Sequence, residues 1–301
     1  MKSKYISHLF LFGAALIYGA NYSIAKVVLD GGFVPAMGLV AFRVMAAAIL
    51  FTVFHFVFIR EKINYRDLPG FIMLSLYGVV INQSFFIVGL KYTVPINAAL
   101  ILTIVPVLVL VFSAIILKEK INTTKITGIL LGFAGVLMII LYRGKVNIGL
   151  GTIKGDLFMF FNTVSYALYL VNVKKMLRKY HPVTVTKWIF LIALVFILPM
   201  GYKGVMQVDF SSFDVSIWIA FVYVLVFTTF FAYLFNILAL RNVNPSVVAV
   251  YVYLQPVLAT IVALLMGKDS LTVEKILAAA FIFTGLYLVS CQKCFVFNKK
   301  S

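Results

Sequence analysis

The sequence predicts an all-α integral membrane protein of ten transmembrane helices, arranged as two inverted five-helix repeats (5+5). Of 301 residues, 63% are hydrophobic and only 12% are charged, which is too little polar surface for a soluble domain. Positions 87–139 also align without a gap with positions 237–289, so that Pro106, Lys118 and Gly135 recur 150 residues later. The sequence therefore indicates an internal repeat, in which one membrane-embedded unit occurs twice.

Ten apolar runs are long enough to cross the hydrocarbon core of a bilayer, which takes about 20 helical residues. In chain order they cover 7–29, 34–59, 68–90, 95–117, 124–142, 155–177, 182–200, 215–239, 246–267 and 273–292. The connections are too short for a soluble domain with its own core. We expect one membrane domain in two halves, residues 1–145 and 146–301.

The first run resembles a signal peptide, because basic residues precede an apolar stretch that reaches Ala20. The apolar run continues to Leu29, however, and the second half contains a counterpart of this segment. We therefore expect an uncleaved first span.

The repeat extends to the N-terminal spans at an offset of 148, which pairs Tyr18 with Tyr166 and Lys26 with Lys174. Five spans thus correspond to five spans. Because five is odd, the two copies must cross the membrane in opposite directions. Opposed copies allow a transporter to open to either side in turn.

The net charge of +17 is spread over the connections and termini. With the N-terminus in the cytoplasm, most lysines and arginines fall on the cytoplasmic side, as the positive-inside rule requires. We expect both termini in the cytoplasm, a bacterial inner membrane location, the lipid bilayer as a partner, and no nucleic acid.

Several short segments carry a resemblance to a known family. They are Gly19-Ala20-Asn21, the pair Phe42-Arg43, the block from Pro106-Val107-Leu108 to Lys118-Glu119-Lys120-Ile121, and its second copy from Pro256-Val257-Leu258 to Gly267-Lys268-Asp269. The chain resembles the EamA-type members of the drug/metabolite transporter superfamily. The resemblance implies a ten-helix bundle with a central cavity lined mainly by helices 1, 3, 4, 6, 8 and 9, with helices 5 and 10 to one side. Many members have Trp where this chain has Tyr18, which bears on the substrate more than on the fold.

Polar residues within the spans gather on helical faces of the spans that would surround a hydrated path. The candidate substrate-binding residues are Asn21, Tyr22, Asn82, Gln83, Asn97, Tyr166, Tyr169, Asn236, Tyr251 and Gln255. Amides are costly against lipid, so they should turn inward to a neighbouring helix or to a ligand. Interhelical bonding for the amides and an interfacial belt for the tyrosines remain open alternatives.

Four basic residues within the spans are candidates for gating or anion contact: Lys26, Arg43, Lys174 and Lys187. Lys26 and Lys174 would form a symmetric pair at opposite ends of the pathway, unless they only snorkel to opposite interfaces. An unpaired guanidinium deep in a span is costly, so Arg43 should meet carbonyls, a dipole or an anionic ligand. A shared packing role is the alternative.

Pro106 and Pro256 lie in the middle of corresponding spans and are candidate hinges. Each removes a helix hydrogen bond from the carbonyl four residues earlier, at Leu102 or Val252. Such carbonyls can serve as ligands, or neighbouring helices can satisfy them.

All nine acidic residues fall in connections or at helix ends, and only Asp156 lies near enough to a span to act within it. Coupling to protons or sodium usually involves an intramembrane Asp or Glu. We therefore expect a facilitator, or coupling through another group. The sequence predicts no catalytic residues, no metal site and no cofactor, and the pair Cys291 and Cys294 alone is a weak metal signal.

Together these features predict a transporter that exports small organic metabolites by alternating access, with amino acids or related amphipathic solutes as candidate substrates. The alternatives are a membrane scaffold or channel without alternating transport, or an intramembrane enzyme. His8, His55 and His181 lie near span ends and no catalytic motif is present, which argues against an enzyme. The Gly128/Gly132 spacing permits close helix contact, so the protein is expected as a monomer or as a homodimer through spans 5 and 10.

Overall fold

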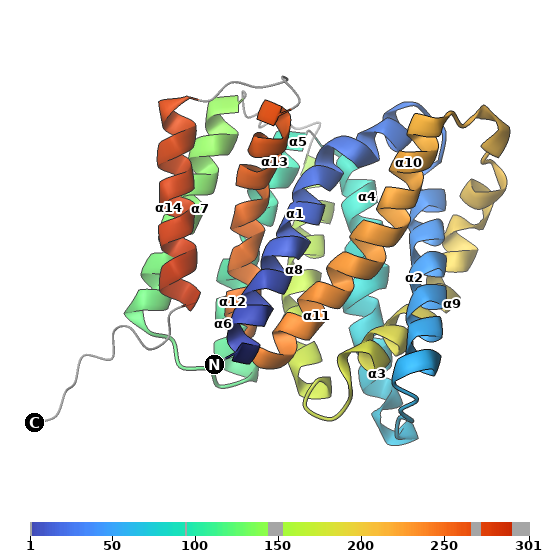
Figure 1. Cartoon of the computed structure of the whole chain (residues 1–301), viewed down its shortest axis with the longest axis horizontal. Helices are drawn as coiled ribbons and strands as arrows, with labels where there is room; N and C mark the ends of the chain where they lie inside the picture. Colours follow the sequence, from blue (N-terminus) through green and yellow to red (C-terminus); the bar gives the residue numbers. More distant parts are fainter. Residues whose placement is uncertain (1, 94, 144–152, 266–271, 291–301) are drawn as a thin grey trace, which may run out of the picture.

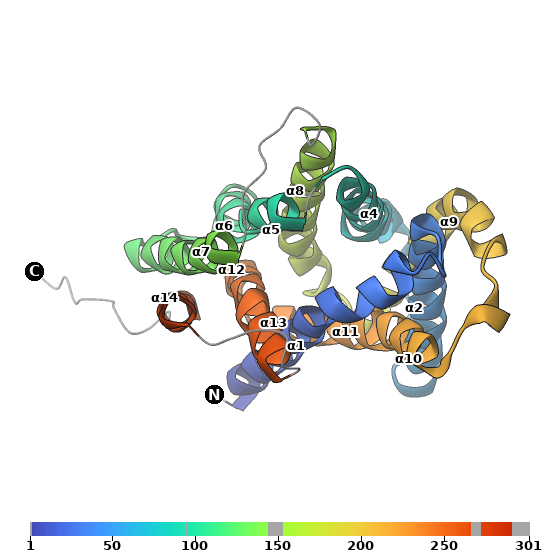
Figure 2. The same cartoon turned by 90° about the horizontal axis from the view of Figure 1, so that it is seen from above.

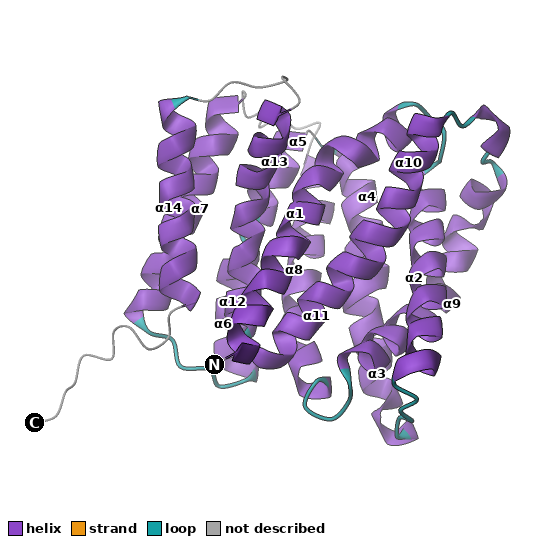
Figure 3. Cartoon of the chain, in the orientation of Figure 1, coloured by secondary structure: helices purple, strands orange, loops and turns teal. Residues whose placement is uncertain are grey.

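The computed structural model describes residues 2–93, 95–143, 153–265 and 272–290. Over these ranges the chain is built of helices joined by short turns (Figure 3). A few side chains within the helices, including those of Tyr22 and Lys26, lie outside the described part.

The helices follow one another along the chain from α1 to α14, with five short 3-10 or π-helical segments between them. They are α1 (Lys2–Asp30), α2 (Ala36–Phe58), η1 (Tyr65–Asp67), α3 (Leu68–Ser75), η2 (Leu76–Ile81), α4 (Asn82–Tyr92), α5 (Pro95–Leu102), α6 (Val105–Ile116), α7 (Thr123–Arg143), α8 (Ile153–Met176), α9 (Pro182–Met206), η3 (Phe210–Ser212), α10 (Val215–Tyr223), η4 (Val224–Phe231), α11 (Ala232–Asn242), α12 (Pro245–Val250), η5 (Tyr251–Tyr253), α13 (Leu254–Leu265) and α14 (Val273–Ser290).

Seven helical stretches in the described part are long and apolar enough to cross a membrane: Ala36–Phe58, Tyr65–Gly89, Thr123–Leu141, Pro182–Met206, Val215–Asn242, Pro245–Val262 and Val273–Ser290. Of two shorter apolar stretches, Tyr5–Asn21 overlaps the predicted span 7–29 and Leu100–Ile116 falls within the predicted span 95–117. The predicted span 155–177 corresponds to α8, whose polar and basic residues lower its apolar character. The fold is therefore all-helical and carries several candidate membrane spans.

The helices pack in antiparallel pairs. Residues 38, 51 and 55 of α2 meet residues 204, 190 and 187 of α9 in turn, so the two helices run in opposite directions. Helices α7 and α14 also pack as an antiparallel pair. This pair lies at one end of the molecule, and α2 and α9 lie at the other (Figures 1 and 2).

The pairings of the first half recur in the second. Helix α1 packs on α11 and α13, and its counterpart α8 packs on α4 and α6. Figure 2 shows α1, α11 and α13 facing α4, α5 and α8 across the middle of the molecule. The centre is thus enclosed by equivalent helices from both halves.

Glycines bring α7 and α14 into close contact. A Cβ atom on Gly128 would lie 2.8 Å from the carbonyl oxygen of Gly285, and one on Gly135 would lie 2.6 Å from that of Ala278. These two contacts are related by the repeat, since Gly128 and Ala278 are equivalent positions 150 residues apart, and so are Gly135 and Gly285. The small-residue face predicted from the Gly128/Gly132 spacing is therefore occupied within the chain.

Two irregularities recur at matched positions. The helix from Leu68 to Tyr92 contains the π-helical segment η2, and the stretch from Val215 to Asn242 contains η4, whose last six residues correspond to η2. The predicted span 95–117 is interrupted between α5 and α6. The equivalent span of the second half is interrupted between α12 and α13 by the 3-10 turn η5.

At the helix break before Pro106, the other half of the molecule provides a hydrogen-bond partner for part of the backbone. The backbone N–H of Thr103 donates to Leu100 at 3.1 Å, in the tighter pattern of a 3-10 turn. The carbonyl oxygen of Thr103 accepts a hydrogen bond from the hydroxyl of Tyr253 at 3.0 Å, in the buried interior. A residue from the other half thus donates a hydrogen bond to a carbonyl at the break. This carbonyl belongs to Thr103, next to Leu102, where the sequence predicts a carbonyl without its helix partner.

Candidate functional site

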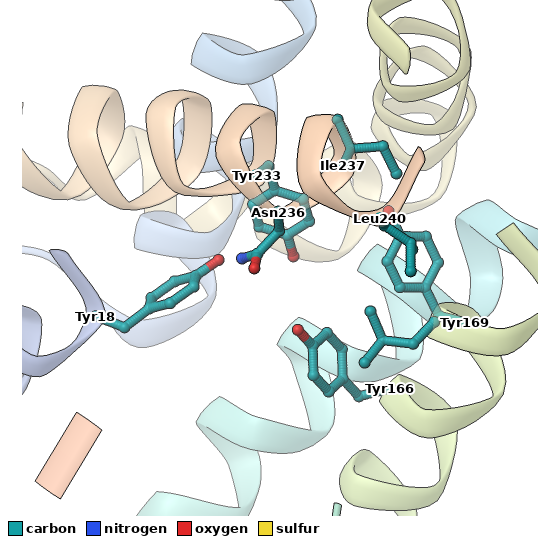
Figure 4. Close-up of a pocket in the computed structure, with 8 residues that line it drawn as sticks. Tyr18, Tyr166, Tyr169, Tyr233, Asn236, Ile237 and Leu240 are labelled. Carbon is teal, nitrogen blue, oxygen red and sulfur yellow. The ribbon is translucent and has the colours of Figure 1, made fainter. Parts of the chain in front are cut away.

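A pocket lies at the centre of the molecule between the two halves (Figure 4). About 290 Å³ of space in this pocket and at its open side is not filled by atoms, and the pocket is lined by Tyr18 of α1, by Tyr166, Tyr169 and Leu170 of α8, and by Tyr233, Asn236, Ile237 and Leu240 of α11. Four phenol rings and one amide therefore supply its polar surface.

Helical spacing explains why these side chains share one pocket. Residues 233, 236, 237 and 240 are one face of α11, and residues 166, 169 and 170 are one face of α8. The rings of Tyr166 and Tyr169 stack on each other with their centroids 6.3 Å apart. In Figure 4 the hydroxyl of Tyr18 points toward Asn236, and the hydroxyl of Tyr166 points into the same space.

A second pocket adjoins the first and shares Tyr18, Tyr166 and Asn236 with it. Its remaining lining is Leu11, Ala14 and Ala15 of α1 with Val248, Tyr251, Val252 and Gln255 of the second half. Residues 11, 14, 15 and 18 form one face of α1. The two pockets together therefore follow α1 from the centre toward the start of that helix.

Neither pocket has a charged residue among its described lining side chains. Arg43 of α2 lies close behind them: its Nε donates to the Thr229 hydroxyl at 3.1 Å, and its charge interacts with Tyr18 and Tyr233. A half-buried guanidinium next to phenol hydroxyls can orient them and attract an anionic group.

Five of the predicted binding residues line the pockets: Tyr166, Tyr169, Asn236, Tyr251 and Gln255. Gln83 lies beside them and donates to the Tyr233 hydroxyl at 3.4 Å.

Other predicted residues lie in helix contacts outside the pocket lining. The Asn97 amide donates to both carboxylate oxygens of Asp156, at 3.4 and 3.3 Å. At Asn82 the backbone carbonyl accepts from Asn162 at 2.5 Å. The Oδ1 atom of Asn21 is buried. The side chains of Tyr22 and Lys26 lie outside the described residues.

The structure brings neither Lys174 nor Lys187 into the pocket lining. The Lys174 ammonium donates to the carbonyls of Leu240, Arg241 and Val243, at 2.5, 3.0 and 2.8 Å, and so binds the C-terminal end of α11. Lys187 lies between α2 and α9, 3.4 Å from Nδ1 of His55 and over the ring of Phe56.

Two pocket tyrosines, Tyr18 and Tyr233, are absent from the predicted site. Tyr18 begins the polar face 18, 21, 22 and 25, and Tyr233 lies one turn before Asn236 on α11. The same helical spacing that selected their neighbours could have found them. The hydrogen bond between His8 and Tyr251, which spans 243 positions, leaves no signal in the sequence.

The family model of the EamA-like transporter family matches residues 5–141 and again residues 153–291. The chain belongs to the EamA-like transporter family. Its similarity to the drug/metabolite transporter superfamily therefore covers both halves, and the protein is an integral membrane protein of a transport family.

Relatives agree with this assignment. The uncharacterized transporter YyaM of Bacillus subtilis is 27% identical over 285 residues, which cover 94% of this chain and 93% of that protein. An uncharacterized transporter of Archaeoglobus fulgidus is 25% identical and covers 85% of this chain and 89% of its own length. A WAT1-related protein of Arabidopsis thaliana is 25% identical over 92% of this chain and 80% of its own length.

A solved crystal structure has the same fold. It superposes with a TM-score of 0.77 at 19% sequence identity, over 94% of this chain and 95% of the other. The helix arrangement around the central pocket is thus the arrangement of a known fold.

Proposed function

We propose that this EamA-like protein is a ten-span secondary transporter that exports small organic metabolites by alternating access. The observation that carries the proposal is the relation between Tyr18 and Tyr166. They occupy equivalent positions of the two halves, and both line the same central pocket. A site shared by equivalent residues of opposed repeats is the arrangement in which one half can rock against the other around a fixed ligand.

The inverted 5+5 topology draws support from the antiparallel pairs α2/α9 and α7/α14 and from the matched helix irregularities. In this topology α1, α8 and the broken segment α5–α6 complete the seven stretches of the described chain to ten spans, over halves 1–145 and 146–301. The distribution of basic residues then puts both termini in the cytoplasm of a bacterial inner-membrane protein.

The chemistry of the pocket favours a small amphipathic substrate. Phenol rings offer flat apolar surface, and their hydroxyls with the Asn236 amide offer donors and acceptors. Arg43 adds a positive field behind Tyr18 and Tyr233. Amino acids and related carboxylates combine an apolar body with groups that suit these partners.

The assembly proposed is a monomer or a homodimer through α7 and α14. The glycine faces of these two helices are used against each other. Their outer faces expose Leu130, Leu141, Leu277 and Phe281, which lipid or a second copy can cover.

Counterflow in liposomes tests the transport function. Purified protein is reconstituted with each of the proteinogenic amino acids at high concentration inside, and uptake of the same labelled amino acid is followed with and without a pH gradient. Exchange of at least one amino acid above protein-free liposomes is expected, and comparison of inside-out with right-side-out vesicles tests the export direction. Absence of exchange for the whole panel and for a wider set of metabolites would favour a scaffold.

A further inference from the structure

Three polar side chains form the boundary between the two pockets. Tyr18, Tyr166 and Asn236 are the described residues that line both of them. In Figure 4 the two hydroxyls and the amide turn toward the same space. Tyr18 and Tyr166 are equivalent residues of the two halves, whereas the position equivalent to Asn236, at the offset of 150, is Phe86. The boundary therefore carries one hydroxyl from each half and an amide from the second half alone.

The polar groups at this boundary have no partner in the part of the chain that the structure describes. The Tyr18 and Tyr166 hydroxyls and the Asn236 amide make no hydrogen bond there. The hydroxyl of Tyr233, by contrast, already accepts one hydrogen bond at 3.4 Å and donates another at 3.3 Å. Polar groups in a protein interior normally have hydrogen-bond partners. Three groups that lack them around one space indicate the place of a ligand's polar group.

The charges around the boundary favour an anion. The described lining of both pockets contains no charged side chain. The Arg43 guanidinium lies behind it, where its charge acts on Tyr18 and Tyr233. A positive charge beside a phenol attracts the oxygen and repels the hydroxyl proton, so the Tyr18 O–H is turned toward the pocket as a donor. A ligand atom at the boundary therefore meets hydrogen-bond donors in a positive field.

We propose that Tyr18, Tyr166 and Asn236 form a carboxylate-binding subsite, and that the transported solutes are small monocarboxylates with an apolar body. This rests on the proposed transport function and narrows its substrate class to compounds in which the carboxylate, and not an amine, is recognised. Each hydroxyl donates one hydrogen bond and the amide nitrogen donates a third, and the two carboxylate oxygens accept all three. Hydrogen bonds to an ionised acceptor are about twice as strong as neutral ones.

The apolar walls of the pockets fit the rest of such a solute. The first pocket offers Leu170, Ile237 and Leu240, and the second offers Leu11 and Val248. A hydrocarbon body can thus lie in either pocket while the carboxylate stays at the boundary. An ammonium group at the same place would meet no carboxylate among the described lining residues, and the nearby guanidinium would repel it.

Matched ligands that share one apolar body test which head group is recognised. The probes are isocaproate, isocaproamide and isoamylamine, with leucine as the acid that also carries an amine. Hydrocinnamate, hydrocinnamamide and phenethylamine repeat the comparison with a larger body. The full-length protein is purified in detergent, and each Kd is obtained at pH 7, where the acids are ionised, from the rise of the unfolding midpoint with ligand concentration. In the wild type the acid of at least one set should bind at least about tenfold more tightly than its amide, and leucine should gain nothing from its amine.

Variants identify the residues responsible. Tyr18→Phe and Tyr166→Phe should each weaken binding of the acid by about tenfold and of the amide by less, because a charge-assisted bond is lost only with the acid. Asn236→Asp keeps the shape of the side chain and replaces the donor with a negative charge, so this variant should reject the acid and bind the amine instead. Asn236→Leu should lose the preference for the acid without gaining the amine.

The controls change the same groups outside the described pocket lining. Asn172→Asp adds a carboxylate to α8, where the Asn172 amide donates to the Leu168 carbonyl at 2.9 Å. Tyr202→Phe removes a hydroxyl from an exposed residue of α9. Both variants should keep the wild-type ratio of acid to amide affinity. Unfolding midpoints without ligand show which variants are folded, and Asn236→Leu serves where Asn236→Asp is not.

Four outcomes overturn the subsite: equal affinities of acid and amide in the wild type, no binding of either acid, a preference for the acid retained in both Asn236 variants, or the same change of preference in Asn172→Asp. Counterflow separates these outcomes from the transport function. Exchange of acid and amide at equal rates keeps the transport function and rejects the subsite. Selective binding of the acid without exchange of any compound keeps the subsite and rejects transport.

Discussion

Gln83 donates from its side-chain amide to the hydroxyl of Tyr233 at 3.4 Å, and the two residues occupy equivalent positions of the two repeats, 150 residues apart. Thr103 and Tyr253 are related by the same offset and are also hydrogen-bonded. Equivalent residues of two related halves can touch only near the axis that relates those halves. Both contacts therefore mark the surface on which one half would move against the other.

Tyr233→Phe should destabilise the protein by about 1–3 kcal/mol. The substitution leaves the buried Gln83 amide without its Tyr233 partner and removes the bond from the Tyr233 hydroxyl to the Gly78 carbonyl, at 3.3 Å. Unfolding in mild detergent measures the effect, with the exposed Tyr5→Phe as a control that should change nothing. Equal midpoints for both variants would mean that the axial bond contributes no stability.

Gly135→Ala should weaken the α7–α14 pair by about 1–3 kcal/mol, because the added methyl meets the Ala278 carbonyl oxygen at 2.6 Å. Gly128→Ala should behave alike, since its contact with Gly285 is the repeat-related one. Ala280→Leu, on the exposed side of α14, is the control for added bulk. Thermal unfolding distinguishes them, and a smaller loss for the glycine variants than for the control contradicts the close packing.

Lys174→Gln should loosen the end of α11, because an amide cannot replace an ammonium that binds three carbonyls. The expected loss is about 2 kcal/mol, with faster hydrogen exchange of the backbone around residues 240–245. Lys175→Gln removes the neighbouring exposed lysine and should leave the exchange unchanged. Similar hydrogen exchange in the two variants would mean that Lys174 only extends to the membrane interface and does not stabilise the end of α11.

Arg43→Gln tests whether the half-buried guanidinium acts on the substrate. We expect at least about a tenfold rise in KM for an exchanged amino acid, the loss of one charge-assisted bond, and a smaller change for its neutral amide. Thr229→Val removes the 3.1 Å bond to Arg43 together with the 3.0 Å bond from the Thr229 hydroxyl to the Val224 carbonyl, and it should lower stability while the preference for the carboxylate remains. A fall in stability with unchanged KM in Arg43→Gln indicates a packing role.

His181 should make stability fall on the acid side. Burial, reinforced by the charge of Arg241, lowers the pKa of His181 below its ordinary value. Its Nδ1 accepts the backbone N–H of Val183 at 3.3 Å and caps α9. A lowered folded-state pKa favours the neutral form, so its contribution is present above about pH 6.5 and is lost as the pH falls toward the folded value. His181→Asn keeps a capping oxygen that does not titrate, so its unfolding midpoint should drop less than that of the wild type between pH 7 and pH 5.

The all-helical fold and much of the pocket can be predicted from the sequence, because both follow from the helical spacing of apolar and polar residues. Tyr166, Tyr169 and Asn236 were selected by helical spacing and do line the central pocket. Spacing on one helix says nothing about the partner across the interior, so the sequence leaves open whether Asn97 faces a ligand or another helix, and only the structure shows its amide bonded to Asp156.

Backbone irregularities were harder to foresee. Pro106 signals a disturbed helix, but the position of the break, after Leu102, depends on the i to i+3 bonds at Thr103 and on the Tyr253 hydroxyl from the other half. The π-helical segments η2 and η4 have no proline or comparable local marker. Such features are set by tertiary contacts, which one sequence does not display.

The paired π-helical segments carry a consequence for how α4 and α11 are phased. A π-helical turn holds an extra residue, and each residue of an α-helix turns the chain by roughly 100°. Rewinding η2 as ordinary α-helix would therefore swing Gln83 to a different side of its helix, and rewinding η4 would do the same to Tyr233. In each repeat the π-helical segment lies just before the residue at the axis, Gln83 or Tyr233. Rewinding these segments would rotate the two residues and change their partners across the axis, without any helix sliding along its length.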